Sequence, residues 1–108
     1  MAITINIYYT GAHAKEFARE MTDSGVVGDI RAEEGNLRYE YFFPMDREDA
    51  VLLIDSWENQ QALDRHHHSP MMARIIALRE KHDLHMKVER YVADEAGIPK
   101  QDQSFIRE

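Results

Sequence analysis

Three consecutive histidines, His66 to His68, are the residues of this sequence best suited to proton transfer or metal binding. If they lie on a helix, their side chains point about 100° apart and cannot converge on one ion. A helical ligand pair needs spacing i and i+4, but Pro70 follows His66 at that distance and Met71 follows His67. We therefore expect no metal site. Proton transfer is the better prospect, because an unperturbed imidazole titrates near about pH 6.5.

Of the three histidines, His66 is the candidate base. Leu63 precedes it by one helical turn on the same stripe, so the His66 ring is expected to face the sheet. We expect His67 and His68 to lie in solvent. The alternative for His66 is a histidine that only forms a hydrogen bond at the edge of the core.

Asp55 is the second candidate catalytic residue, because it interrupts an apolar stretch. A carboxyl group in such surroundings must be paired or have a shifted pKa. It could orient His66 or hold a substrate hydroxyl. Alternatively, it could pair with a structural arginine such as Arg38 or Arg90.

Further candidates could bind a substrate. Trp57, Tyr39 and Tyr41 could line a pocket for a planar ligand, although aromatic residues on buried strands often serve only as core. Asn6 is the only amide on the first predicted strand, and the sheet face that it occupies is left open.

Hydrophobic periodicity predicts the elements that position these residues. Gly25 is expected to end a first helix, Asn59 to cap a second, and Ser69 to cap its restart with Pro70 as the first helical residue. The predicted elements are a strand over 3–9, a helix around 17–21, a short helical turn over 26–32, strands over 37–43 and 50–57, a helix from 59 that restarts at 69 and ends near 82, and a strand over 84–92.

The order β-α-β-β-α-β predicts an α+β, ferredoxin-like fold with a four-stranded antiparallel sheet. Both helices then cover one sheet face and leave the other open, with Tyr8, Phe42 and Tyr91 on it. We expect a homodimer joined through this open face. Residues 1–94 form the predicted domain, and 95–108 form a tail that we expect to be ordered only along a partner subunit.

Composition narrows the range of partners. The 108 residues suffice for one domain, and a net charge of -7, from 13 Lys+Arg against 20 Asp+Glu, argues against nucleic acid. No apolar run reaches the roughly 18 residues of a membrane span, and the start lacks the features of a secretory signal, so we expect a cytoplasmic protein. There is no cysteine and no glycine-rich loop of the nucleotide-binding kind, so we expect no cofactor, and an enzyme here would rely on the chemistry of its small-molecule substrate.

Four stretches together resemble the antibiotic biosynthesis monooxygenase family. They are Glu-Glu-Gly-Asn-Leu-Arg-Tyr-Glu at 33–40, Asp-Ser-Trp-Glu at 55–58, Ala-Leu-Asp-Arg-His at 62–66 and Ser-Pro at 69–70. The resemblance implies a small dimeric α+β barrel. Members of the family include quinol monooxygenases, polyketide-tailoring oxygenases and an isomerase of a phosphorylated quorum-sensing signal.

Individual positions carry the resemblance. Gly35 matches the turn glycine of the family, Tyr39 an aromatic of its second strand, and His66 the histidine that follows Ala-Leu by three residues. Asp55 matches an acid that is usually Glu, beside the matching aromatic Trp57. The family commonly has a second histidine just after Ser-Pro, where this chain has Met71, so only a one-histidine site is implied.

The resemblance implies a cofactor-independent monooxygenase acting on a small electron-rich phenol or quinol. His66 would remove a proton, and the resulting anion would react directly with dioxygen. Two alternatives stay open. The same base could shuttle a proton in an isomerase of a small hydroxy-ketone signal metabolite, a branch that the run 35–38 resembles, or the dimer could bind a small ligand without catalysis.

Overall fold

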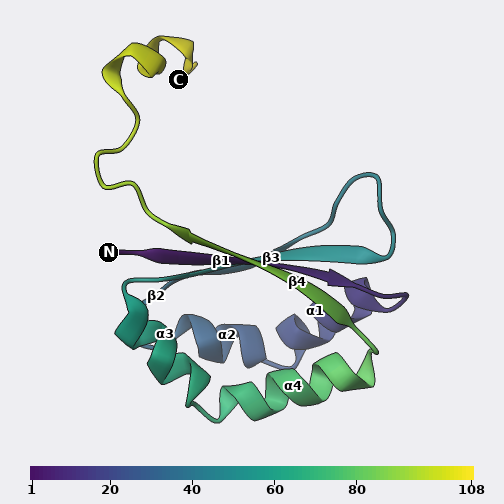
Figure 1. Ribbon diagram of the computed structural model, residues 1–108. Coiled ribbons are helices and arrows are strands. Elements are labelled where there is room, and N and C mark those ends of the chain that lie inside the picture. Colours follow the sequence, from purple (N-terminus) through teal and green to yellow (C-terminus); the bar gives the residue numbers. More distant parts are fainter.

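Four strands form a single sheet, and α1 to α4 all lie on one side of it (Figure 1). The structure, a computed structural model, describes all 108 residues. Its elements are β1 (Ile3–Thr10), α1 (Ala14–Asp23), α2 (Val26–Arg31), β2 (Asn36–Phe42), β3 (Ala50–Trp57), α3 (Gln60–His67), α4 (Met71–Lys81), β4 (His85–Val92) and a 3-10 helix, η1 (Lys100–Phe105).

The sheet has the order β2-β3-β1-β4, and each neighbouring pair is antiparallel. This confirms the predicted ferredoxin-like α+β fold. The register places Ile7 of β1 opposite Leu53 of β3 and Val88 of β4. Ile7 and Leu53 are buried under the helices, while Leu52 and Ile54 alternate with them on the open face and are only half-buried. The central strands therefore carry apolar residues on both faces, as expected for a sheet whose two faces are both covered.

Glycine separates the first two helices. The chain ends α1 at Asp23, and Gly25 adopts a φ of +89° immediately before α2. A left-handed residue at this place is common after a helix, and glycine adopts it without a steric penalty. The short helical turn predicted over 26–32 is present as α2, whose residues Val26, Val27 and Ile30 are buried.

The second helical region is also divided in two. Asn59 caps α3 as predicted, because its side-chain oxygen accepts a hydrogen bond from the Ala62 amide at 2.8 Å. The prediction that Ser69 caps the restart was wrong. Helix α4 begins at Met71 after Pro70, and the buried Ser69 hydroxyl has no hydrogen-bond partner.

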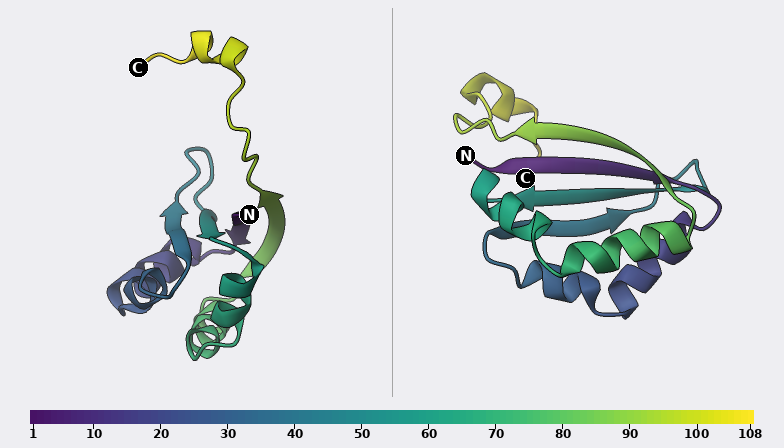
Figure 2. Two further views of the ribbon diagram at one scale, coloured as in Figure 1. Left: turned by 90° about the vertical axis from the view of Figure 1, so that its left-hand side faces the viewer. Right: turned by 60° about the horizontal axis from the view of Figure 1, so that its bottom comes forward.

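The core lies between the sheet and the helices, and Trp57, Tyr9 and Phe17 are its largest fully buried side chains. The opposite sheet face is not covered by any element of the same chain (Figure 2). After Val92 the chain leaves the sheet on this open side, and every residue of 93–108 is exposed. None of the helices is long and apolar enough to cross a membrane.

Candidate functional site

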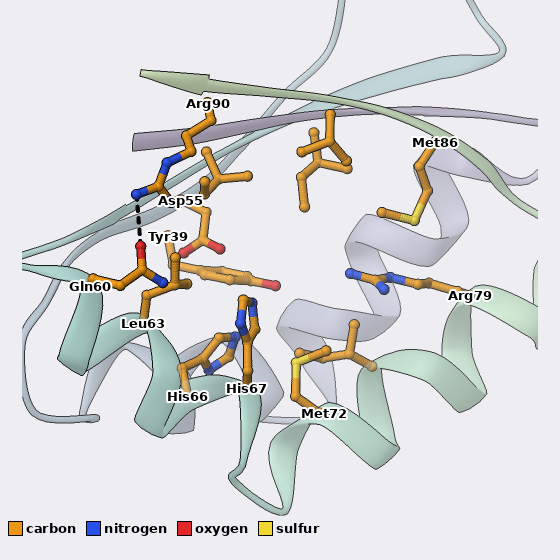
Figure 3. Close-up of a pocket in the computed structure, with 14 residues that line it drawn as sticks. Tyr39, Asp55, Gln60, Leu63, His66, His67, Met72, Arg79, Met86 and Arg90 are labelled. Atoms are coloured by element: carbon orange, nitrogen blue, oxygen red, sulfur yellow. Dashed lines mark hydrogen bonds between the residues drawn. The ribbon is translucent and has the colours of Figure 1, made fainter. Parts of the chain in front are cut away.

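A cavity of about 300 Å³ lies between α3, α4 and the β1–β4 side of the sheet (Figure 3). Apolar side chains form much of its wall, among them Ile5 and Ile7 from β1 and Leu63 and Ile75 from the helices. Val88 of the edge strand β4 lines the outer part and is half exposed. The cavity is therefore apolar toward the core and open toward the β4 edge.

His66 lies on the inner wall of this cavity. Its side chain is only 3% exposed, and its ring stacks on the indole of Trp57 with centroids 4.7 Å apart. The Nδ1 atom lies 2.6 Å from a carboxylate oxygen of Glu33, in the turn before β2. Because a carboxylate only accepts, Nδ1 carries the proton and donates it, which leaves Nε2 with the lone pair.

The charge state of His66 follows from two opposing effects. Burial lowers the pKa of His66, and the hydrogen bond to Glu33 raises it in part but does not reverse the change. The ring is therefore neutral at pH 7. Nε2 has no hydrogen-bond partner within the chain, so it is available to accept a proton from a molecule in the cavity.

Asp55 lines the same cavity from β3. Burial raises the pKa of its carboxyl to about 7, while a 2.6 Å hydrogen bond from the Trp57 indole and the charge of Arg79 oppose the rise. Asp55 is thus divided between its acid and its carboxylate at neutral pH. It forms no salt bridge with Arg38, which pairs with Glu40.

The other candidate residues are distributed unevenly. Tyr39 lines the cavity, and Trp57 lies behind it in contact with both His66 and Asp55. Tyr41 lines a different hollow beside α1, and its buried hydroxyl has no partner. Asn6 lies on the open sheet face beside Ile54, with an unpartnered buried side-chain oxygen. The structure therefore brings His66, Asp55, Trp57 and Tyr39 together, and leaves Tyr41 and Asn6 outside.

Two residues at this site were not among the sequence candidates. Glu33 holds His66, and Arg79 of α4 reaches the cavity wall, where its Nε donates to the Tyr9 hydroxyl at 3.0 Å. Arg79 shares a helical stripe with the apolar Met72 and Ile75, and a charge within such a stripe is a signal that could have identified it.

The three consecutive histidines differ in burial: His66 is buried, and the other two are exposed. His67 is exposed, as predicted, but it also lines the mouth of the cavity, and His68 is exposed away from it. Nowhere do three or more His, Asp or Glu side chains form a group that could hold a metal ion.

Comparison with known proteins assigns this chain to a family. The sequence profile of the antibiotic biosynthesis monooxygenase family matches residues 1–78, so the chain belongs to this family. No curated protein matches the sequence significantly.

Solved structures of the same fold include three informative cases. A Pseudomonas aeruginosa protein is 25% identical, with 85% of this chain and 93% of that chain covered and a TM-score of 0.71. A Mycobacterium tuberculosis protein is 21% identical, with coverage of 90% and 100% and a TM-score of 0.69. SnoaB, a cofactor-independent oxygenase from Streptomyces nogalater, is 16% identical, with coverage of 87% and 94% and a TM-score of 0.71.

Proposed function

We propose that the protein is a cofactor-independent monooxygenase that oxidises a small electron-rich phenol or quinol, with Nε2 of His66 as the base. The observation that carries this proposal is a buried neutral imidazole whose Nδ1 proton is committed to Glu33 and whose Nε2 is free at a cavity. Membership of the monooxygenase family and the similarity in fold to SnoaB, an oxygenase without a cofactor, support it.

The chemistry begins with the transfer of the substrate hydroxyl proton to Nε2 of His66. The phenolate gives one electron to dioxygen, and the phenoxyl radical and superoxide combine to form a carbon–oxygen bond. Nε2 of His66 then returns its proton to the distal peroxide oxygen. The O–O bond breaks as the hydrogen on that carbon leaves as a proton, and the departing hydroxide takes up a proton, which yields a quinone carbonyl and water. One oxygen atom enters the product, the other enters water, and the substrate supplies all four electrons.

The remaining site residues fit supporting roles in this reaction. The protonated form of Asp55 can hydrogen-bond the substrate or give its proton to the departing hydroxide. Tyr39 and the apolar wall restrict water around the radical pair. Glu33 acts as a positioning residue, because its contact is with His66.

Oxygen uptake with simple hydroquinones tests the proposal. We expect His66→Ala to lower the rate by about 10²- to 10⁴-fold, the usual contribution of a positioned base. His13→Ala is the matched control, because His13 is exposed and bonded only to the neighbouring Glu16. Equal oxygen consumption by the parent and the His66 variant would exclude the histidine as the base.

A second candidate function is isomerisation of a small hydroxy-ketone. It is favoured by the presence of two titratable groups, His66 and Asp55, that line one cavity, since the pKa of Asp55 is raised to about 7. Turnover under nitrogen separates the two reactions, since only an isomerase works without oxygen. Saturable binding with no turnover under either atmosphere would indicate a ligand-binding module.

We further propose that the working unit is a homodimer formed through the open sheet face. Leu52, Ile54, Phe42 and Tyr91 lie on this face and remain partly or largely exposed in the single chain. Apolar side chains grouped on one side of a sheet are expected to be covered by a partner.

A further inference from the structure

The cavity of the proposed active site is more cationic than the rest of the molecule. Arg79 and Arg90 line it, against the single carboxyl of Asp55. Neither arginine forms a salt bridge, and Arg90 only donates to the neutral amide oxygen of Gln60 at 2.7 Å. Carboxylates are not scarce in a chain with 20 Asp+Glu and 13 Lys+Arg. Several exposed arginines also lack an acidic partner, but Arg79 is the one arginine of the chain that is half-buried.

Three arginines outside the cavity do have an acidic partner. Arg38, Arg47 and Arg74 each pair with a carboxylate at 3.0 to 3.2 Å. Those pairs lie on the exposed surface, where an ion pair gains little and an unpaired charge is well hydrated. Arg90 is exposed as well, but Arg79 is half-buried and has less access to water, so its unpaired guanidinium costs more.

Arg79 is held in place by Tyr9. Its Nε donates to the Tyr9 hydroxyl at 3.0 Å, and its guanidinium carbon lies 5.5 Å from the centre of the Tyr9 ring. Tyr9 is completely buried, so it forms a fixed support for the arginine. Both terminal nitrogens of Arg79 make no hydrogen bond within the chain. A planar guanidinium with two free donors at a cavity has the geometry that binds a carboxylate through two parallel hydrogen bonds.

Asp55 does not serve as that partner. Its carboxyl is engaged by the Trp57 indole, and it lies beyond salt-bridge distance of Arg79. Figure 3 shows Arg79 entering the cavity from α4 and Arg90 lying at the opposite end, with Asp55, Tyr39 and His67 between them. A ligand that reaches from the histidine side to Arg79 would place an anionic group on the arginine.

We propose that the substrate is a single-ring aromatic carboxylate whose carboxylate is bound by Arg79 while its ring hydroxyl faces His66. The volume of about 300 Å³ lies at the low end of ligand pockets, about 300 to 1,000 Å³, which favours one ring over a fused system. This inference rests on the proposed function in one respect, namely that the ring carries a phenolic hydroxyl. Recognition of the carboxylate stands on the arginine and the cavity.

Binding under nitrogen tests this inference without any turnover. The probes are 4-hydroxybenzoate and its uncharged isostere 4-hydroxybenzamide, with dissociation constants measured by calorimetry. We expect the carboxylate to bind at least about tenfold more tightly, as charge-assisted hydrogen bonds do. Arg79→Met should remove this preference. Arg65→Met is the matched control, because it removes the same positive charge from an arginine that is exposed on α3 and does not line the cavity.

The results separate this inference from the proposed function. Equal affinity of the parent protein for the two probes overturns it without reliance on any variant. A preference that survives in Arg79→Met overturns the assignment to Arg79. Oxygen uptake with 2,5-dihydroxybenzoate is measured separately, and its absence would count against the oxygenase while the binding preference stands.

Discussion

The carboxyl of Asp55 occupies a place where its charged form is disfavoured, and this has a measurable effect on stability. Its folded pKa of about 7 lies above its ordinary value of 3.8, so the folded chain binds more protons than the unfolded chain between these values. The resulting stabilisation is complete below about pH 3.8 and is lost as the pH rises through about 7. Three pKa units correspond to about 4 kcal/mol at most.

Asp55→Asn provides the test. The amide oxygen can still accept the Trp57 indole hydrogen bond, but it does not titrate. We expect the two proteins to have similar free energies of unfolding at pH 4, and the variant to be more stable by up to about 4 kcal/mol at pH 8. Urea unfolding at several pH values measures the difference. Parallel stability curves for the two proteins would show that Asp55 keeps an ordinary pKa.

Residue type and local context were enough to predict that His66 and Asp55 face the space between helices and sheet, because Asp55 interrupts an apolar strand and His66 follows Leu63 by one helical turn. Glu33 and Arg79 could not be assigned in this way. Glu33 meets His66 across 33 residues of sequence, and Arg79 meets Tyr9 across 70. Such contacts depend on how helices and strands pack, which periodicity within one element does not contain.

At the scale of elements, one glycine controls how α3 approaches the sheet. Gly35 has a φ of +84°, and a Cβ there would lie 2.5 Å from the Cβ of Ala62 in α3. Its carbonyl also accepts a hydrogen bond from the Glu58 amide at 2.8 Å. A side chain at this position would push α3, and with it His66, away from the turn that carries Glu33.

We expect Gly35→Ala to lower the free energy of unfolding by about 2 to 4 kcal/mol, from backbone strain and overlap together. Oxygen uptake should fall as well, because His66 is displaced. Gly28→Ala is the matched control, since a Cβ there meets nothing within 4 Å and its position is helical. The control should be stabilised by up to about 1 kcal/mol. Equal thermal unfolding of the two variants would contradict this account of Gly35.

Strands were easier to predict than helix starts. The bounds of β3 agree with the prediction, because alternation and turn residues define it locally. The start of α4 was misplaced because Ser69 already belongs to the turn that ends α3, where its amide donates to the His66 carbonyl at 3.0 Å. A residue type that favours an N-cap does not show whether that residue is already part of the turn that ends the preceding helix.

The whole molecule exposes more surface than a chain of its size should. Its accessible area is 7224 Å², whereas a folded monomer of 12.7 kDa is expected to expose about 6,200 Å². The radius of gyration is 15.5 Å, against an expected value of about 13 Å. The excess of about 1,000 Å² is comparable to the roughly 800 Å² that one partner contributes to a stable interface. The exposed residues 93–108 and the uncovered sheet face both contribute to this surface.

The tail has a regular shape but no support from its own chain. The last backbone hydrogen bond to the rest of the chain is donated by the Ala93 amide to the Ala2 carbonyl. Within residues 95–108 every backbone hydrogen bond joins residues three apart, and Phe105 of η1 is 87% exposed. Ile98 is 58% exposed as well. Because the tail extends on the side of the open sheet face, we propose that residues 95–108 pack on the partner subunit of the homodimer.

Sedimentation velocity over a range of concentrations tests this arrangement. We expect a dimer whose dissociation constant rises at least about tenfold when Phe105 and Ile98 are both replaced by serine, because each buried apolar side chain contributes about 1.5 to 3 kcal/mol. Gln101→Ser is the control within the same 3-10 helix and should leave the dimer unchanged. Ile54→Asp, on the open sheet face, should give monomers with or without the tail. A dimer unaffected by the double serine variant would mean that the sheet faces alone hold the subunits together.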